Sequence, residues 1–314
     1  MAKVELNFGT DAQAPAAGSE AQPLRSTGQS RAGASYYSKA DDCLRLFAYS
    51  YRPIYADSPP RVAFGNPQTR LGSFVHELLM RHYNHKKDGG VPEAAPTRLN
   101  RVELEALAKA EGMPPGEVGY AVTEMFRRFK HYVVARALHP WRPLKIEEEF
   151  AVGVLSVNPQ DPNAPAVLVP EGTPGSVLFT ARIDLVAEDN AGVWFNDHKT
   201  GENTTDSTAE AYGLTTQIHG HERLGRYFYG DRFQGVKLNF FPTGGEFGGK
   251  VKFEEPVRPK PAPWMVEDFP RTIWRAAQRI AFHDATAKSA RDWPAKAQYS
   301  CSWCAYRSFC QKGG

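Results

Sequence analysis

Four side chains along the middle of the chain have the chemistry needed to bind a metal ion and a phosphate. Asp184 lies in an apolar run, and Asp197 and Lys199 end the next run, where alternation places both on one face of a strand. His76 comes earlier, on the flank of a helical apolar stripe. Two carboxylates supply oxygen ligands for Mg²⁺ or Mn²⁺, a lysine can orient water or stabilise charge, and a histidine nitrogen favours Mn²⁺. Together these residue types suit hydrolysis of a phosphodiester.

Each of these residues also has an ordinary structural interpretation. An Asp-x-Lys pair on a strand is usually a surface salt bridge, and a single helical histidine usually packs. The order of the whole set favours function. In chain order, the set is His76, Asp184, Asp197, Lys199 and Gln217. Glu147 and Glu149 are further acidic candidates, although a solvated strand face explains them equally well.

The four cysteines are unevenly distributed. Cys43 is alone, whereas the other three form the pattern Cys301-x₂-Cys304-x₅-Cys310. Four cysteines in a chain of 314 residues are too few for a disulfide scaffold, so their placement indicates a metal site. Four thiolates suit either tetrahedral zinc or a [4Fe–4S] cluster, and the spacing does not choose between them.

The elements that position these residues predict an α/β core with a mixed sheet flanked by helices. A helix capped by Ser38 and carrying Cys43 should run to Pro53. Periodicity predicts further helices at 71–83, 103–110, 117–138, 207–229 and 263–290, and strands at 145–154, 177–187, 193–199, 236–241 and 250–254. Residues 189–192 should turn a hairpin between the second and third strands.

Composition sets the domain organisation. Residues 1–35 are rich in Ala, Gly, Ser, Gln and Pro and predict a disordered tail. Residues 36–314 should form one domain, with a helical insertion at about 85–140. A net charge of +3 permits nucleic-acid binding without indicating it. The sequence has neither a long apolar run nor a signal peptide, so we expect a soluble cytoplasmic protein with no membrane partner.

Three motifs give the chain a resemblance to a known family. They are Gly72-Ser73-Phe74-Val75-His76-Glu77-Leu78, Ala181-Arg182-Ile183-Asp184-Leu185-Val186 and Trp194-Phe195-Asn196-Asp197-His198-Lys199-Thr200-Gly201. The chain resembles the PD-(D/E)XK nuclease superfamily, which has a restriction-endonuclease-like core, and within it the RecB-like exonucleases.

The resemblance implies a role for each site residue. His76, Asp184 and Asp197 would be metal ligands, helped by the His198 carbonyl, and Lys199 would be the catalytic lysine. Gln217 would contact substrate or the active site. The family usually has a tyrosine four residues after this glutamine, whereas here His221 occupies that position.

The cysteine arrangement resembles that of AddB-type and CRISPR-adaptation nucleases. By that resemblance, Cys43, Cys301, Cys304 and Cys310 would bind a [4Fe–4S] cluster that staples the two ends of the domain together. Neighbouring aromatic side chains would shield the cluster from water; they are Tyr299, Trp303, Tyr306 and Phe309.

Two segments interleave positive charge with aromatic rings, as surfaces that hold a single strand do. They are residues 127–132 and the helix bearing Arg223, Arg226, Tyr227 and Tyr229. Both can equally be ordinary amphipathic helices.

We therefore expect a metal-dependent DNA nuclease, best described as a single-stranded DNA exonuclease acting in DNA processing, repair, recombination or phage- or CRISPR-related metabolism. The alternative is a DNA-binding subunit of a helicase–nuclease or integration complex with weak intrinsic activity. Helicase, recombinase and integrase chains are the partners to expect. The sequence has no phosphate loop of the Gly-x₄-Gly-Lys-Ser/Thr type, so a motor would be another chain.

Overall fold

The computed structural model describes residues 32–52, 67–90, 96–137, 139, 141–161, 163–201, 206–244, 246–296, 301, 304, 306, 307 and 310. Most of the predicted tail, residues 1–31, lies outside this part of the chain. The last residues of that tail are held in place: Ala32 donates its N–H to Thr180 Oγ1 and accepts the N–H of Thr180, both at 3.1 Å. Residues 32–35, which the composition assigned to the tail, therefore belong to the described fold.

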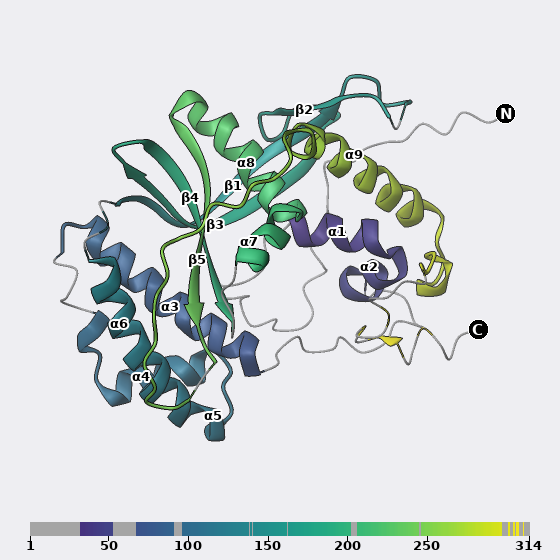
Figure 1. Ribbon diagram of the computed structural model, residues 1–314. Coiled ribbons are helices and arrows are strands. Elements are labelled where there is room, and N and C mark those ends of the chain that lie inside the picture. The colour runs from purple at the N-terminus through teal and green to yellow at the C-terminus, as the bar shows by residue number, and fades with distance from the viewer. Residues whose placement is uncertain are drawn as a thin grey trace.

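A five-stranded mixed sheet forms the centre of the molecule (Figure 1). The strand order is β2-β1-β3-β4-β5; β4 and β5 are parallel, and the other neighbours are antiparallel. The strands are β1 (Arg142–Ser156), β2 (Ala166–Val169), β3 (Val177–Asp189), β4 (Gly192–Gly201) and β5 (Phe233–Pro242). This arrangement confirms the predicted fold class. β2 was not predicted, because four edge residues give little periodicity. The predicted strand at 250–254 is wrong, since pairing beyond β5 is limited, among described residues, to the bridge between Leu238 and Val257.

Helices cover both faces of the sheet. They are α1 (Ala34–Asp42), α2 (Leu44–Tyr51), α3 (Pro67–Lys87), α4 (Arg101–Ala110), α5 (Pro115–Tyr120), α6 (Phe126–Arg136), α7 (Asp206–Gly213), α8 (Thr216–Tyr229) and α9 (Pro263–Thr286). A π-helical turn, Ala121–Met125, joins α5 to α6. Within the described part of the chain, no helix combines the length and the apolar character that a bilayer crossing requires.

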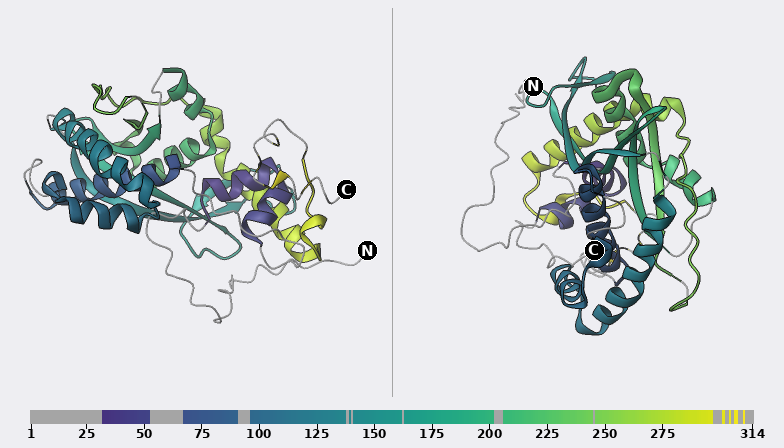
Figure 2. Two further views of the ribbon diagram at one scale, coloured as in Figure 1. Left: turned by 90° about the horizontal axis from the view of Figure 1, so that it is seen from below. Right: turned by 90° about the vertical axis from the view of Figure 1, so that its left-hand side faces the viewer.

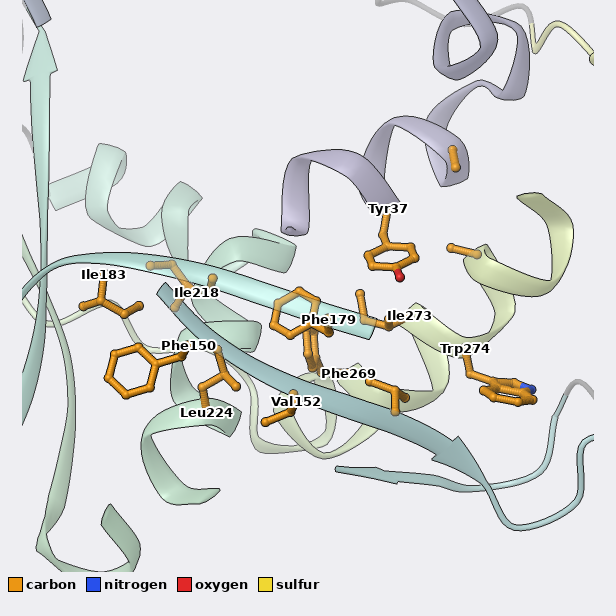
Figure 3. Close-up of a cluster of buried hydrophobic side chains, with 14 of the residues drawn as sticks. Tyr37, Phe150, Val152, Phe179, Ile183, Ile218, Leu224, Phe269, Ile273 and Trp274 are labelled. Atoms are coloured by element: carbon orange, nitrogen blue, oxygen red, sulfur yellow. The ribbon is translucent and has the colours of Figure 1, made fainter. Parts of the chain in front are cut away.

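The larger core lies between the sheet and the helices α1, α2, α8 and α9. Figure 3 shows Tyr37 of α1 and Phe269 of α9 meeting Phe179 of β3. The Phe179 and Phe269 rings are 4.9 Å apart and nearly perpendicular, the edge-to-face arrangement that aromatic pairs prefer. This core fixes the strands from one side.

A second core lies on the other side, where α3 to α6 pack together and against the sheet. It buries Phe74 and Leu78 of α3 with Phe129 of α6, and Leu185 of β3 belongs to it as well. In Figure 1 these helices gather on the left of the sheet. Helix α3 is therefore held firmly across β3 and β4, which places His76 next to both strands.

Candidate active site

The β3–β4 hairpin brings the two predicted aspartates onto neighbouring strands. Its ladder runs from Asp189–Gly192 at the turn to Leu185–Asn196. Beyond that pair, the Asp184 carboxylate takes the place of a backbone acceptor: the N–H of His198 donates to Asp184 Oδ2 at 2.7 Å. The strands therefore part at the point where the candidate residues begin, and their side chains have room to converge.

Helix α3 delivers His76 to this opening. His76 Nε2 donates to the backbone carbonyl of His198 at 3.1 Å, which leaves Nδ1 directed at two carboxylates. Nδ1 lies 3.7 Å from Glu147 Oε1 and 3.8 Å from Asp184 Oδ2. The close approach of the helix needs Gly72, because a Cβ there would come within 2.8 Å of Thr200 Oγ1.

Glu147 is the acidic residue that the tertiary structure adds to the site. It lies on β1 opposite Asp184, between the ladder pairs Ile146–Leu185 and Glu148–Ile183. Its φ of 49° is the one positive value at a described residue other than glycine, and this backbone distortion turns the carboxylate toward His76. Alternation alone grouped Glu147 with Glu149; no sequence signal marks the distortion that separates them.

Charges within this cluster shift the pKa values of its members. Burial lowers the pKa of His76, but the carboxylates of Asp184, Glu147 and Asp197 outweigh burial and raise it to about 9. Burial raises the pKa of Asp184, but His76 and the His198 side chain and N–H hold it below its usual range. Without a metal ion, the cluster therefore consists of a positively charged imidazole among negatively charged carboxylates.

The donor set fits a hard divalent cation. Ligand atoms of His76, Glu147 and Asp184 all lie within 4.8 Å of one another. Octahedral ligands about 2.1 Å from Mg²⁺ are about 3.0 Å apart when adjacent and about 4.2 Å apart when opposite. The separations of 3.7 and 3.8 Å lie between these limits, so small side-chain movements would complete the site. One imidazole and two carboxylates match Mg²⁺ or Mn²⁺.

Asp197, Lys199 and Gln217 form a closed triangle beside the cluster. Lys199 Nζ lies 2.8 Å from Asp197 Oδ2 and donates to Gln217 Oε1 at 3.1 Å. Gln217 Nε2 donates to Asp197 Oδ1 at 3.2 Å. Burial lowers the pKa of Lys199, but Asp197 and Asp184 raise it above its usual value, so the lysine is a cation at neutral pH.

His221 lies one turn after Gln217 on α8 and faces the same region. It is buried, and its pKa is lowered by burial against an opposing contribution from Asp197 and Asp184. Its Nδ1 has no hydrogen-bond partner within the described structure. The residue that replaces the tyrosine of the family pattern is thus a neutral imidazole near the aspartates and Lys199.

A buried hydrogen-bond network contacts the His198 side chain on the side of the second core. The His198 ring nitrogen Nδ1 lies 3.7 Å from Asp184 Oδ2, and Nε2 lies 3.4 Å from the Tyr132 hydroxyl. That hydroxyl also contacts the Tyr83 hydroxyl at 2.7 Å and receives a hydrogen bond from Asn239. The His198 side chain therefore links a candidate metal ligand to the second core, a role that its sequence position did not suggest.

Burial favours the interpretation of residues 127–132 as an ordinary amphipathic helix over that of a strand-binding surface. Arg128, Phe129 and Tyr132 are fully buried. Arg127 and Arg128 are both paired with Glu124, at 2.8 and 2.6 Å. The alternation of cations and aromatic rings here reflects packing of an amphipathic helix: Glu124 neutralises both arginines, while Lys130 and His131 lie on the exposed face.

The cations of α8 have a structural partner on α9. Arg223 and Arg226 lie 2.8 and 3.2 Å from the two carboxylate oxygens of Glu267. Both also line a small depression of about 210 Å³ together with Val167, Leu168 and Tyr227. The ion pairs join the two helices, so these arginines are less available to a phosphate backbone than their sequence indicates.

The ends of the domain meet near the cysteines. Cys43 is extended, with φ −158° and ψ 110°, and it divides the single helix predicted after Ser38 into α1 and α2; the helix begins earlier, with Gly33 as its N-cap. Two residues later, Arg45 donates to the carbonyls of Trp293 and Arg291 at 3.0 Å. The left view of Figure 2 shows α1 and α2 beside the C-terminal segment.

The thiols themselves share one neighbourhood. Arg45 Nη1 contacts Cys310 Sγ at 3.8 Å, and Cys304 and Cys310 pack against buried Tyr49 and Tyr306. Burial raises the pKa of Cys304, the backbone N–H of Tyr306 lowers it, and the other three thiols raise it further. Four free thiols near one another suit a tetrahedral metal or a cluster, although among the described residues their sulfur atoms do not converge as closely as the ligand atoms of His76, Glu147 and Asp184. Of the predicted shielding aromatics, Tyr306 is buried, and Tyr299, Trp303 and Phe309 lie outside the described residues.

Comparison with known proteins identifies the family. The model described as "PD-(D/E)XK nuclease superfamily" matches residues 31–311. No curated protein sequence matches the chain. The solved structure "Crystal structure of SSO0001" aligns with 78% of this chain and 93% of its own chain, at 10% identity and a TM-score of 0.31. A similarity this low carries no argument.

Proposed function

The chain belongs to the PD-(D/E)XK nuclease superfamily, and on this premise we propose that it is a divalent-metal-dependent exonuclease acting on single-stranded DNA. The observation that carries the proposal is the convergence of ligand atoms of His76, Glu147 and Asp184 within 4.8 Å, next to the partly buried Lys199. Nucleases of this superfamily use Mg²⁺ or Mn²⁺. The donor set of this chain suits the same ions.

We assign His76, Glu147 and Asp184, whose ligand atoms converge, as ligands. Asp197, which pairs with Lys199 beside this group, is a further ligand by the family resemblance. When bound, the divalent ion would neutralise charge on the scissile phosphate and activate a water molecule. The resemblance also makes the His198 carbonyl a metal ligand. This carbonyl accepts a hydrogen bond from His76 Nε2, which leaves His76 Nδ1 facing the carboxylates. Asp184 is oriented in turn by the His198 N–H.

Lys199 supplies positive charge on the other side of the cluster. Its ammonium group, held by Asp197 and Gln217, is placed to stabilise the negative charge that develops on the phosphate or to orient the attacking water. Gln217 keeps Lys199 and Asp197 in register through both ends of its amide. Hydrolysis by this set needs no covalent intermediate.

The preference for single strands and for ends rests on the resemblance to RecB-like and AddB-like nucleases. The resemblance also underlies our proposal that Cys43, Cys301, Cys304 and Cys310 bind a [4Fe–4S] cluster. In support, Arg45, two residues after Cys43, donates hydrogen bonds to the carbonyls of Trp293 and Arg291 and contacts Cys310 Sγ. The cluster would close a long loop and stabilise the domain.

The test is digestion of end-labelled and internally labelled DNA, single- and double-stranded, with Mg²⁺ and with Mn²⁺. We expect metal-dependent release of mononucleotides or short products from single strands, and loss of that activity in Asp184→Ala. Full activity of Asp184→Ala would refute the proposed site. Cleavage confined to circular or double-stranded DNA would refute the proposed specificity, and strong DNA binding without cleavage would favour a DNA-binding subunit of a larger complex.

A further inference from the structure

A buried ion pair lies beneath the loop that follows β5. Glu124, in the π-helical turn, and Arg128, in α6, are 0% and 1% exposed, and Arg128 Nε lies 2.6 Å from Glu124 Oε1. Burying two charges is costly and is tolerated only where hydrogen bonds satisfy their remaining donors and acceptors. A π-turn inside a helix is itself uncommon and is often found at functional sites. The hydrogen-bond partners of Glu124 and Arg128 therefore indicate which part of the structure this buried pair stabilises.

Arg128 is bound to the loop rather than to the core. Its guanidinium donates to the carbonyls of Pro242 at 3.2 Å and of Glu246 at 3.4 Å. It also donates to the carbonyl of Gly244. Three backbone acceptors within five residues are thus fixed by one buried side chain.

Glu124 and Arg127 hold the far side of the same loop. Glu124 Oε2 accepts the N–H of Gly248 at 3.1 Å, and Arg127 Nη2 donates to the carbonyl of Gly249 at 2.8 Å. Loops that connect elements at a protein surface are usually mobile. In this one, residues 242–249, charged side chains hold the backbone at residues 242, 244, 246, 248 and 249.

The clamped loop lies at the edge of the sheet that carries the candidate active site. β4 and β5 are parallel, with Lys199 paired to Phe240 and Gly201 to Pro242. The next residue, Thr243, donates its N–H to Gly201 at 2.8 Å. Strands rise about 3.3 Å per residue, so Pro242, the first residue of the loop, lies roughly 7 Å beyond the level of Lys199. In Figure 1 the chain after β5 continues toward α4 and α5.

What the clamped loop presents to solvent is an aromatic ring. Phe247 is 63% exposed, and its ring centroid lies 6.3 Å from that of Tyr120. Tyr120 is fixed in turn, because its hydroxyl donates to the carbonyl of Thr243 at 3.1 Å. Lys250, just after the loop, is exposed and adds positive charge. A fixed aromatic face with a nearby cation is the arrangement on which nucleic-acid bases stack without regard to sequence.

We propose that Phe247, held by the Glu124–Arg128 clamp, is a stacking platform for an unpaired nucleobase of the substrate strand. The proposal rests on the nuclease function proposed above and adds a binding position to it. A stacked strand advances about 3.4 Å per nucleotide, and the loop starts about two residues of strand beyond Lys199, so the platform would meet a base two or more nucleotides from the phosphate at the metal cluster. The platform would keep the strand in register while successive phosphates reach the site.

The experiment uses the full chain with Ca²⁺ in place of Mg²⁺ or Mn²⁺, and oligothymidylates of 3 to 16 nucleotides. Phe247→Ala should weaken binding of the longer oligonucleotides about tenfold and leave the trinucleotide unaffected. Phe247→Trp, which keeps an aromatic ring, should bind as tightly as the wild type. The matched control is Phe282→Ala, an exposed phenylalanine on α9, which should bind as the wild type does. Phe247 is largely exposed, so its variants should fold, and melting temperatures verify this.

Fluorescence quenching at defined positions of the strand shows which base stacks on Phe247. 2-Aminopurine placed at successive positions of the strand should be quenched at one position in the wild type, and Phe247→Ala should abolish that quenching. Equal affinity of Phe247→Ala and wild type at every length would overturn the platform, while metal-dependent cleavage by the wild type would leave the proposed nuclease intact. Phe247-dependent binding in a protein that cleaves no DNA would uphold the platform and refute the nuclease.

Discussion

Glu147 Oε1 lies 3.7 Å from His76 Nδ1, although helices α4 to α6 separate the two residues in the sequence. Glu147 reaches this position through a positive φ of 49°. Such a backbone conformation costs on the order of 1–3 kcal/mol and persists only where surrounding structure enforces it. Here the neighbouring ladder pairs of β1 and β3 enforce it, and the product is a third ligand atom for a divalent ion.

Glu147→Gln should reduce Mn²⁺ affinity and DNA cleavage by on the order of 100-fold or more, because a neutral amide replaces one of the charged ligands. Isothermal titration with Mn²⁺ and a cleavage assay measure both. Glu148→Gln is the matched control, since that neighbouring carboxylate is 46% exposed and pairs with Lys145. Equal effects of the two substitutions would show that the positive φ has no role in metal binding.

Lys199→Met should abolish cleavage while leaving DNA binding in Ca²⁺ within about twofold, since stabilisation of developing charge acts only during reaction. Gln217→Ala should lower the cleavage rate less, by roughly tenfold, because Lys199 keeps its contact with Asp197 at 2.8 Å. Single-turnover rates with saturating enzyme separate the two effects. Normal turnover by Lys199→Met would remove the lysine from the mechanism.

Tyr132→Phe should destabilise the fold by about 1–3 kcal/mol, because it leaves buried groups of Tyr83, Asn239 and His198 without their shared partner. It should also slow cleavage, because His198 supports Asp184. Urea denaturation and cleavage rates test the two consequences. Tyr227→Phe, at an exposed position, is the control and should change stability by less than about 0.5 kcal/mol.

The Glu124 carboxylate predicts an acid limit to stability. Hydrogen bonds from Arg127 and Arg128 outweigh burial and hold its pKa at about 2, below the usual 4.5. The folded state then binds fewer protons than the unfolded state between these values, so the free energy of unfolding should fall as the pH drops from about 4.5 toward 2. Denaturation curves across this range measure the slope. Glu124→Gln should be less stable at pH 7 and should show a flatter slope; an unchanged slope would exclude Glu124 as the origin.

Cys304→Ser should lose iron, the visible absorbance of the cluster and single-stranded DNA binding together, because the proposed cluster would hold α2 against the C-terminal segment. Cys43→Ser should have the same effect, although it is far from Cys304 in the chain. Anaerobic purification with iron and zinc analysis tests both. Wild-type protein that contains zinc and no iron would contradict the proposed cluster and indicate a zinc site instead.

Local pattern in the sequence was sufficient for the strands that carry Asp184, Asp197 and Lys199, because alternation on a half-buried strand is encoded residue by residue. The hairpin turn at 189–192 followed from the same pattern and sets the two aspartates on adjacent strands. The apolar stripe of α3, with His76 on its flank, was equally local. The motifs around these residues were enough to indicate the family.

Tertiary structure decided what depends on neighbours distant in sequence. It separated Glu147 from Glu149 through a backbone distortion that β3 enforces. It also buried Arg128, Phe129 and Tyr132 of the cationic and aromatic run at 127–132, where Glu124 neutralises both arginines. It also divided the first helix at Cys43 and gave Phe247 a rigid support. Periodicity records which face of an element is apolar; only packing determines which charges meet inside it.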